Sequence, residues 1–167
     1  MATDPAPVIE VQDIVTRFGA RTVHGGVSFT VERGTLVGLI GSSGSGKSVL
    51  LRELIGLQRP TAGRVALLGT DIWQAPPDEL DALRRRFGMM FQDGALFSSL
   101  SVAQNVAVPL REHTPLAPST IDALVALRLL QAGLPVEAGA RRPSELSGGM
   151  RKRAAIARAI ALEPELL

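Results

Sequence analysis

The feature that most constrains this chain is a glycine-rich loop at residues 41–48, GSSGSGKS, which matches the pattern G-x-x-x-x-G-K-[ST] in full. An apolar run at residues 36–40 precedes the loop; it is too short for a helix and suits a strand buried on both faces. After the loop, apolar residues recur at helical spacing from Val49 to Ile55. The sequence therefore predicts a strand, a loop and a helix in succession, the context in which this motif binds phosphate rather than matching by accident.

The residue types in this phosphate loop explain how it would bind the phosphates of a nucleotide. Glycines let the backbone curl round an anion, so that successive N–H groups and the positive end of the helix point at it. Lys47 would reach the β- and γ-phosphates of a nucleotide, and the Ser48 hydroxyl would coordinate Mg²⁺. The predicted nucleotide contacts are Gly41, Ser42, Ser43, Gly44, Ser45, Gly46, Lys47, Ser48 and Val49.

Composition excludes several classes of protein. The 167 residues suit one domain, and 46% hydrophobic with 20% charged residues is the balance of a globular chain. Without cysteine there are no disulfides or thiolate metal sites. The start of the chain lacks the pattern of a secretion signal, and no apolar run is long enough to span a membrane. A net charge of only +2, with few aromatic residues between the arginine clusters, argues against nucleic acid as a partner.

Two strands are predicted before the phosphate loop, over residues 8–15 and 26–31, and we expect them to form a small antiparallel layer beside a main sheet. Phe18 stands in the turn between them. It could stack on an adenine base, or it could be an ordinary aromatic closing a hairpin, and its position alone leaves both open.

Past the phosphate loop, a strand with its turn is predicted over residues 64–72, and a short helix from Pro77 to about Arg86. A second buried strand is predicted over residues 87–91, with Gln92 at its end. Ligands of open α/β sheets bind beyond the carboxyl ends of strands, which places Gln92 on the edge that carries the phosphate loop. Gln92 could orient an attacking water or touch Mg²⁺, or it could be a loop amide bonded to backbone.

The following segment is predicted to be helical. Residues 101–104 form a capping box that starts a helix, which Pro109 is expected to close, and a second helix is predicted over residues 119–131. Ser147, Gly148 and Gly149 then precede a strong helix former at residues 151–161. A hydroxyl, exposed amides and the helix dipole make a second anion-binding terminus there, although a lone Ser-Gly-Gly is usually just an N-cap.

In combination, these residues resemble the ATP-binding subunits of ABC transporters over nearly the whole chain. Residues 41–48 look like the Walker A loop, Gln92 like the Q-loop glutamine, residues 146–150 like the signature, and Phe18 like the aromatic that stacks on adenine. The closest likeness is to the ATPase of Mla-type, MCE-associated phospholipid transporters. It is carried by the strings FQDGALF at 91–97, PLREHT at 109–114 and ELSGGM at 145–150, where Met150 replaces the usual glutamine.

The resemblance implies an α/β fold: a P-loop core with an antiparallel β layer over residues 1–94, a helical subdomain over 95–145, and the signature with its helix over 146–167. It implies that two subunits pair head to tail, Lys47 of one and Ser147, Gly148 and Gly149 of the other binding the same ATP with Mg²⁺. Gln92 would be catalytic, and would share the metal with Ser48. Hydrolysis would drive an MCE-type permease that moves phospholipid, with the ATPase peripheral on the cytoplasmic face of the inner membrane.

One departure and three rival interpretations accompany this resemblance. The family's Walker B strand, with its Mg²⁺-associated Asp and catalytic Glu, would begin where this sequence stops, so we expect the front part of a longer ATPase that is inactive alone. The rivals are the ATPase of another transporter, a chromosomal ATPase and a non-catalytic nucleotide-binding module. The chromosomal class inserts a long coiled coil between the loop and the signature, for which the spacing from Lys47 to Ser147 leaves no room.

The loop after Gln92 contains two bulky apolar residues, Leu96 and Phe97. If exposed, they suit a pocket that receives a helix of the permease, and a helix docked there could sense the nucleotide through Gln92. The alternative is that both side chains fold inward against the helical subdomain.

Overall fold

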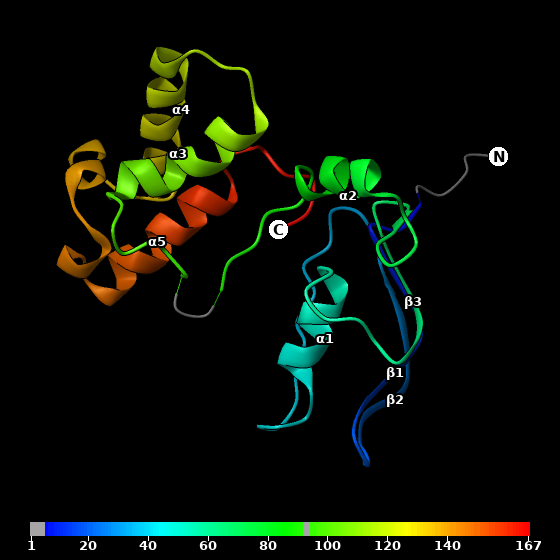
Figure 1. Cartoon of the computed structure of the whole chain (residues 1–167). Coiled ribbons are helices and arrows are strands. Elements are labelled where there is room, and N and C mark those ends of the chain that lie inside the picture. The colour runs from blue at the N-terminus through cyan, green and yellow to red at the C-terminus, as the bar shows by residue number, and fades with distance from the viewer. Residues whose placement is uncertain (1–5, 92–93) are drawn as a thin grey trace. The chain divides into compact units, whose positions relative to one another are not determined.

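The computed structural model describes residues 6–91 and 94–167. They form two compact units, Met1–Leu83 and Arg84–Leu167, which are described one at a time (Figure 1). The domain boundaries expected at residues 94/95 and 145/146 remain predictions. No helix in the described part of the chain is both long enough and apolar enough to cross a bilayer.

The first unit is built on an antiparallel sheet with the strand order β2-β1-β3-β4. A two-residue turn joins β1 to β2, so that Phe18 pairs with Arg21 at the tip of a long hairpin (Figure 1). The predicted antiparallel layer is therefore confirmed, with a longer second strand than expected. The strands are β1 Ile9–Phe18, β2 Arg21–Val31, β3 Ala62–Leu67 and β4 Thr70–Asp71.

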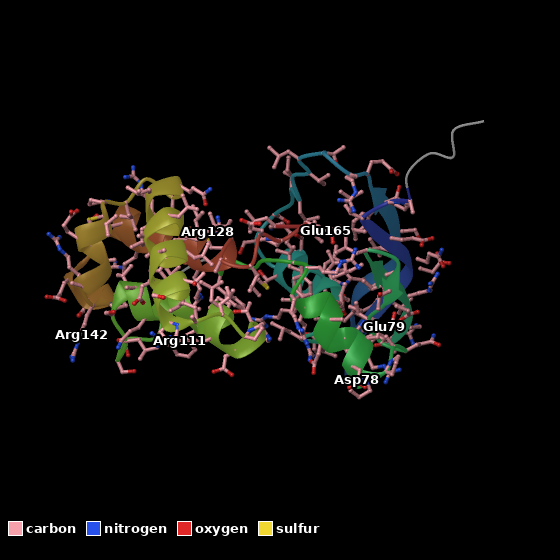
Figure 2. All side chains as sticks on the ribbon, turned by 90° about the horizontal axis from the view of Figure 1, so that it is seen from above. Asp78, Glu79, Arg111, Arg128, Arg142 and Glu165 are labelled. Atoms are coloured by element: carbon pink, nitrogen blue, oxygen red, sulfur yellow. The ribbon has the colours of Figure 1, made fainter. Side chains whose placement is uncertain are left out.

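Helix α1, Lys47–Leu54, packs against β3. Its buried residues are Leu50, Glu53 and Leu54, which recur at the spacing of one helix face. Val11 and Ile14 of β1 and Val65 of β3 are also buried in this unit. The apolar face of α1 therefore fixes the helix that begins within the phosphate loop. Helix α2, Pro77–Arg84, carries Asp78 and Glu79 in its first turn, where the helix dipole favours acidic side chains (Figure 2).

The strand predicted at residues 36–40 is wrong for this structure. These residues form no strand, and the side chains of Leu36 and Ile40 are 103% and 94% exposed. A buried parallel strand needs hydrogen-bonding neighbours on its flanks. Among the described residues no strand pairs with this segment, so the run does not adopt the strand conformation that its apolar composition predicts.

The second strand predicted in the main sheet, residues 87–91, is also wrong except at its first residue. Phe87 forms a single parallel bridge with Leu166, and the Gly88 N–H donates to the Leu166 carbonyl oxygen at 2.8 Å. Met90 and Phe91 are exposed. One bridge aligns the start of a parallel pair, but no further ladder follows it in the described residues.

The second unit is helical and has one apolar core, to which α3, α4 and α5 all contribute. The predicted helix at residues 119–131 is confirmed as α4. The helices are α3 Val102–His113, α4 Pro118–Gln131 and α5 Gly148–Ala159, with short 3-10 helices at Val136–Ala140 and Pro143–Glu145.

Pro109 does not close the helix that Ser101 opens. The capping box is confirmed, but α3 runs through Pro109 to His113. An interior proline removes one helical hydrogen bond and costs about 3 kcal/mol in an unsupported helix. Ala107 and Leu110, on either side of Pro109, are both 2% exposed, and their burial in the core offsets that cost.

Arg128 of α4 (Figure 2) is buried, with only 4% of its surface exposed, and it links α4 to the segment that follows α5. It donates to the carbonyl oxygen of Ala161 at 3.4 Å and to Glu163 Oε1 at 2.6 Å. A buried arginine needs such partners because an unpaired charge is costly to desolvate. These contacts hold α4 against the residues that follow α5, the helix that begins at the signature segment.

Candidate functional site

A cavity of about 480 Å³ opens beside the phosphate loop in the first unit. This is within the usual size range of small-molecule sites. The hairpin of β1 and β2 supplies one side, and the loop with the start of α1 supplies the other. The lining residues are Phe18, Arg21, Val23, Ser43, Gly44, Gly46, Lys47, Ser48 and Val49.

The loop and the helix α1 present cationic and N–H groups to this cavity. Lys47 Nζ donates to the carbonyl oxygens of Gly41 and Ser42, both at 2.7 Å, which holds the ammonium group over the loop. Gly46 adopts φ +97°, a conformation that strongly favours glycine, and helix α1 begins at the next residue. The amides and positive dipole of the first helical turn, with Lys47, are features that suit an anion.

Phe18 lies at the tip of the hairpin with 51% of its surface exposed, and it lines the same cavity as Lys47. The structure therefore brings an exposed aromatic ring and a lysine to one cavity, although the two residues are 29 positions apart, 18 to 47. Arg21 and Val23 of β2 line the cavity as well, and sequence reasoning missed both. The available signal was the alternation of side chains along a strand. Arg21 pairs with Phe18 across the turn, and Val23, two residues further along, lies on the same face of the sheet.

A buried polar cluster lies beneath the loop, and it too was missed from the sequence. Glu53 of α1 is fully buried, Thr16 of β1 is 2% exposed and His24 of β2 is 6% exposed. Thr16 Oγ1 donates to Glu53 Oε1 at 2.6 Å, and His24 Nδ1 lies 3.0 Å from Thr16 Oγ1. The signal for Glu53 was an acidic residue on the face of α1 that carries Leu50 and Leu54.

The other predicted nucleotide contacts belong to the second unit. Ser147 is the N-cap of α5, and its Oγ accepts from the Met150 N–H at 3.3 Å. Gly148 and Gly149 form the first turn of that helix. The amides of a first turn lack helical partners and can bind an anion, so the local geometry suits the expected role. Gln92, expected to be catalytic and to share the metal with Ser48, lies outside the described residues.

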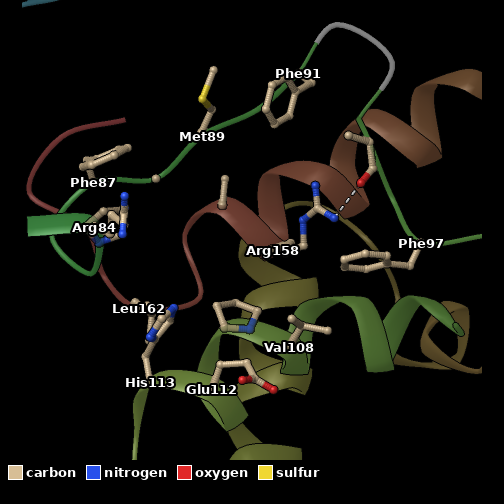
Figure 3. A pocket seen from close by; sticks show the side chains of 15 residues that line it. Arg84, Phe87, Met89, Phe91, Phe97, Val108, Glu112, His113, Arg158 and Leu162 are labelled. Carbon is tan, nitrogen blue, oxygen red and sulfur yellow. Dashed lines mark hydrogen bonds between the residues drawn. The ribbon is translucent and has the colours of Figure 1, made fainter. Parts of the chain in front are cut away.

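A second cavity, of about 380 Å³, lies in the second unit and is lined in part by Phe97, Phe91, Pro109 and Arg158 (Figure 3). Phe97 is 52% exposed. Leu96, by contrast, packs against the core of the unit. The structure thus divides the predicted apolar pair, with Leu96 folded inward and Phe97 facing the cavity.

Two polar side chains hold the loop at residues 94–97. Arg158 of α5 donates to the carbonyl oxygen of Ala95 at 2.8 Å (Figure 3) and to that of Gly94 at 2.8 Å. Burial lowers the pKa of its guanidinium. Asn105 of α3, fully buried, accepts from the Phe97 N–H at 2.7 Å and donates to the Phe97 carbonyl oxygen at 3.1 Å. The position of Phe97 is therefore fixed from two helices.

The described residues include no cluster of three or more His, Cys, Asp or Glu side chains that could hold a metal ion alone. Ser48 lines the phosphate-loop cavity and is exposed, so its hydroxyl is available to a cation. Mg²⁺ commonly takes one or two protein ligands and completes its shell with phosphate oxygens and water. The donor set therefore fits a Mg²⁺ ion that arrives with a nucleotide.

The comparison with protein families matches residues 24–167 to the family described as ABC transporter. Among curated relatives, the probable ribonucleotide transport ATP-binding protein mkl of Mycobacterium tuberculosis H37Rv is 44% identical over 159 residues, 95% of this chain. The intermembrane phospholipid transport system ATP-binding protein MlaF is 42% identical in Haemophilus influenzae and 41% in Escherichia coli K12, over 96% and 100% of this chain. The chain spans 44%, 60% and 62% of the length of these three relatives.

Solved structures agree in fold. The dimeric, post-hydrolysis ATP-binding cassette MJ0796, bound to ADP and phosphate, superposes with a TM-score of 0.84 at 29% identity, covering 93% of this chain and 70% of that one. CbiO1 of Clostridium perfringens, part of the ABC transporter complex cbiONQ, gives 0.81 at 26%, covering 96% and 63%. The predicted α/β P-loop fold is confirmed. With the family match covering most of its residues, the chain belongs to the ABC transporter family.

Proposed function

We propose that the cavity beside the phosphate loop binds ATP with Mg²⁺, and that the protein to which this chain belongs uses ATP hydrolysis to power lipid transport. The observation that carries the proposal is that Phe18 and Lys47 line one cavity of about 480 Å³. The adenine would stack on Phe18, which is exposed at the hairpin tip. The polyphosphate would lie along residues 41–48, where Lys47 and the amides at the start of α1 neutralise its charge.

The residues expected to act on the nucleotide then have defined tasks. Lys47 exchanges its loop carbonyl partners for phosphate oxygens, a charge-assisted contact. The Ser48 hydroxyl would hold Mg²⁺, which supplies charge neutralisation at the phosphates once bound. Gln92 would orient the attacking water at the same metal. The remaining residues of 41–49 shape the phosphate cradle.

The second half of the composite site would come from another copy of the protein. Ser147, Gly148 and Gly149 would grip the nucleotide held by Lys47 of the partner subunit, in a head-to-tail dimer. Support comes from the free amides at the start of α5 and from the dimeric state of the MJ0796 cassette. Mixing Lys47→Ala with Ser147→Arg subunits of the full-length protein tests the arrangement. A mixed dimer has one site with both lesions and one with neither, so some ATPase activity should return.

The transported substrate is proposed to be phospholipid, because relatives named MlaF match all or nearly all of the chain. The relative named mkl, 44% identical, favours a second candidate, ribonucleotide transport. The permease would be of the MCE or Mla type, contacted through the loop at residues 94–97 and the exposed Phe97, with the ATPase peripheral on the cytoplasmic face of the inner membrane. No nucleic acid is proposed as a partner.

Two experiments test these proposals separately. Titration of the chain with a fluorescent ATP analogue, displaced by ATP and not by AMP, tests the nucleotide site; absence of saturable binding would overturn it. Purification of the full-length ATPase with its permease, followed by reconstitution, tests the substrate. Phospholipid-dependent turnover supports the Mla-type role, whereas stimulation by ribonucleotides alone would replace it with the second candidate.

A further inference from the structure

The buried cluster of Thr16, His24 and Glu53 links three elements at the base of the phosphate loop. Thr16 lies on β1, His24 on β2 and Glu53 on α1. Glu53 Oε1 accepts from the Thr16 hydroxyl, and Oε2 lies 3.3 Å from His24 Nδ1. No hydrogen bond from a described residue reaches Oε2. The imidazole of His24 is therefore the side chain that faces Oε2 of this buried residue.

The network assigns the proton on the imidazole. The Thr16 hydroxyl has one hydrogen, which it donates to Glu53, so in its 3.0 Å contact with His24 the Thr16 oxygen must accept. His24 Nδ1 is therefore the donor. The ring is held at this inner edge by two groups, and its orientation follows from them.

The outer edge of the same ring lies against the phosphate loop. A Cβ atom placed on Gly46 would fall 2.5 Å from His24 Nε2 and 2.7 Å from Val23 Cγ1. Gly46 is buried, unlike residues 41–45, and its carbonyl oxygen accepts the first helical hydrogen bond of α1, from the Leu50 N–H at 2.9 Å. The imidazole thus fills the space behind the residue that immediately precedes Lys47.

We propose that His24 is a positioning residue for the phosphate loop: Thr16 and Glu53 orient its ring at Nδ1, and the Nε2 edge braces Gly46 so that Lys47 and the first amides of α1 meet the phosphates. The inference rests on the proposed ATP site and adds a residue that does not itself touch the nucleotide. A loop braced in the binding conformation loses less freedom when the ligand arrives, so the brace raises affinity without a direct contact.

The two edges of the ring can be separated by substitution. An asparagine amide reaches about as far as Nδ1 and keeps the inner contacts, whereas a glutamine amide reaches about as far as Nε2 and keeps the outer one. We therefore compare His24→Asn, His24→Gln and His24→Ala in the whole chain, measuring the Kd of a fluorescent ATP analogue and the thermal unfolding midpoint of each. Glu53→Gln, which leaves the ring against Gly46, is the fourth variant.

We expect the affinity for the ATP analogue to depend on the contact of the Nε2 edge with Gly46. We expect stability to depend on the contacts that Nδ1 makes with Thr16 and Glu53. His24→Asn and His24→Ala should weaken binding by about tenfold or more, whereas His24→Gln should stay within about threefold of wild type. Glu53→Gln should lower the unfolding midpoint with little change in Kd. If His24→Asn bound as tightly as wild type, or if the Kd of every folded variant simply followed its stability, His24 would be a structural residue only.

Two arms keep the outcome decisive. Should the other His24 variants not fold, Glu53→Gln and His24→Gln still test the brace, because a loss of affinity in proportion to stability in either variant contradicts it. Lys47→Ala separates the inference from the proposed function. If wild type binds and Lys47→Ala does not, the ATP site stands whatever the His24 series gives; if wild type itself does not bind, the proposed function fails first.

Discussion

The guanidinium carbon of Arg158 lies 6.0 Å from the centre of the Phe97 ring, while its nitrogens donate to the carbonyl oxygens of Gly94 and Ala95. Arg158 stands on α5, the helix that Ser147 caps. The loop at residues 94–97 and the C-terminal end of α5 are therefore joined within one unit by a cation–π contact and two hydrogen bonds. A partner that moved Phe97 would act on the helix that presents Ser147.

Phe97→Asp in the full-length protein should abolish co-purification with the permease and lipid transport, because it places a charge on the exposed ring position that faces the cavity. ATP binding should persist. Leu127→Asp, a change at a similarly exposed apolar residue on α4, is the matched control and should retain the permease. If Phe97→Asp kept both permease and transport, the docking surface would have to lie elsewhere.

Lys47→Ala should weaken ATP binding by about 1.5–3 kcal/mol, roughly 10- to 150-fold in Kd, because it removes a charge-assisted contact to phosphate. Calorimetric titration of the folded variant measures the change. Arg52→Ala removes an exposed cation from the same helix and should leave Kd nearly unaltered. Equal losses in both variants would mean that general positive charge, and not the position of Lys47, attracts the nucleotide.

Ser147 should separate into a capping role and a nucleotide role. Ser147→Ala removes the acceptor of the Met150 N–H and should cost about 1 kcal/mol of stability. Ser147→Asp keeps a good N-cap, so its thermal unfolding midpoint should equal or exceed that of Ser147→Ala. Its negative charge would nevertheless repel phosphate, and ATPase turnover of the full-length dimer should fall. Normal turnover in Ser147→Asp would leave Ser147 as a cap alone.

Asn105→Ala should destabilise the second unit by about 1–3 kcal/mol, since it leaves the Phe97 N–H and several loop carbonyl groups without their buried partner. Thermal unfolding measures this as a midpoint lowered by roughly 4 °C or more. Ser119→Ala, an exposed change on α4, should shift the midpoint little. A wild-type midpoint for Asn105→Ala would mean that the loop holds itself in place.

The local parts of the fold were predictable from sequence because their determinants are local. The hairpin of β1 and β2, the capping box at Ser101 and the N-cap at Ser147 each depend on residues a few positions apart, and each was found. Pro109 was misjudged because its tolerance depends on burial of Leu110 against other helices. The hydrophobic periodicity of one segment does not show which other helices or strands pack against it.

For the candidate site as well, features within one short segment were predictable from sequence and contacts between distant residues were not. The phosphate loop can be recognised from the glycines of one short segment. The cluster of Thr16, His24 and Glu53, by contrast, joins residues 8 to 37 positions apart, and no sequence pattern links them. The strand predicted at residues 36–40 failed for a related reason, because a parallel strand is specified by its neighbours as much as by its own apolar residues.

The uncovered segment at residues 36–40 should also affect how the molecule behaves in solution. Four exposed apolar side chains around one glycine, with no sheet partner among the described residues, are an open template for β-pairing between copies. Any preparation that leaves them bare should precipitate with rising concentration and recruit chaperones that hold apolar segments. Solubility on dilution, followed by light scattering, therefore reports whether another strand has covered this run.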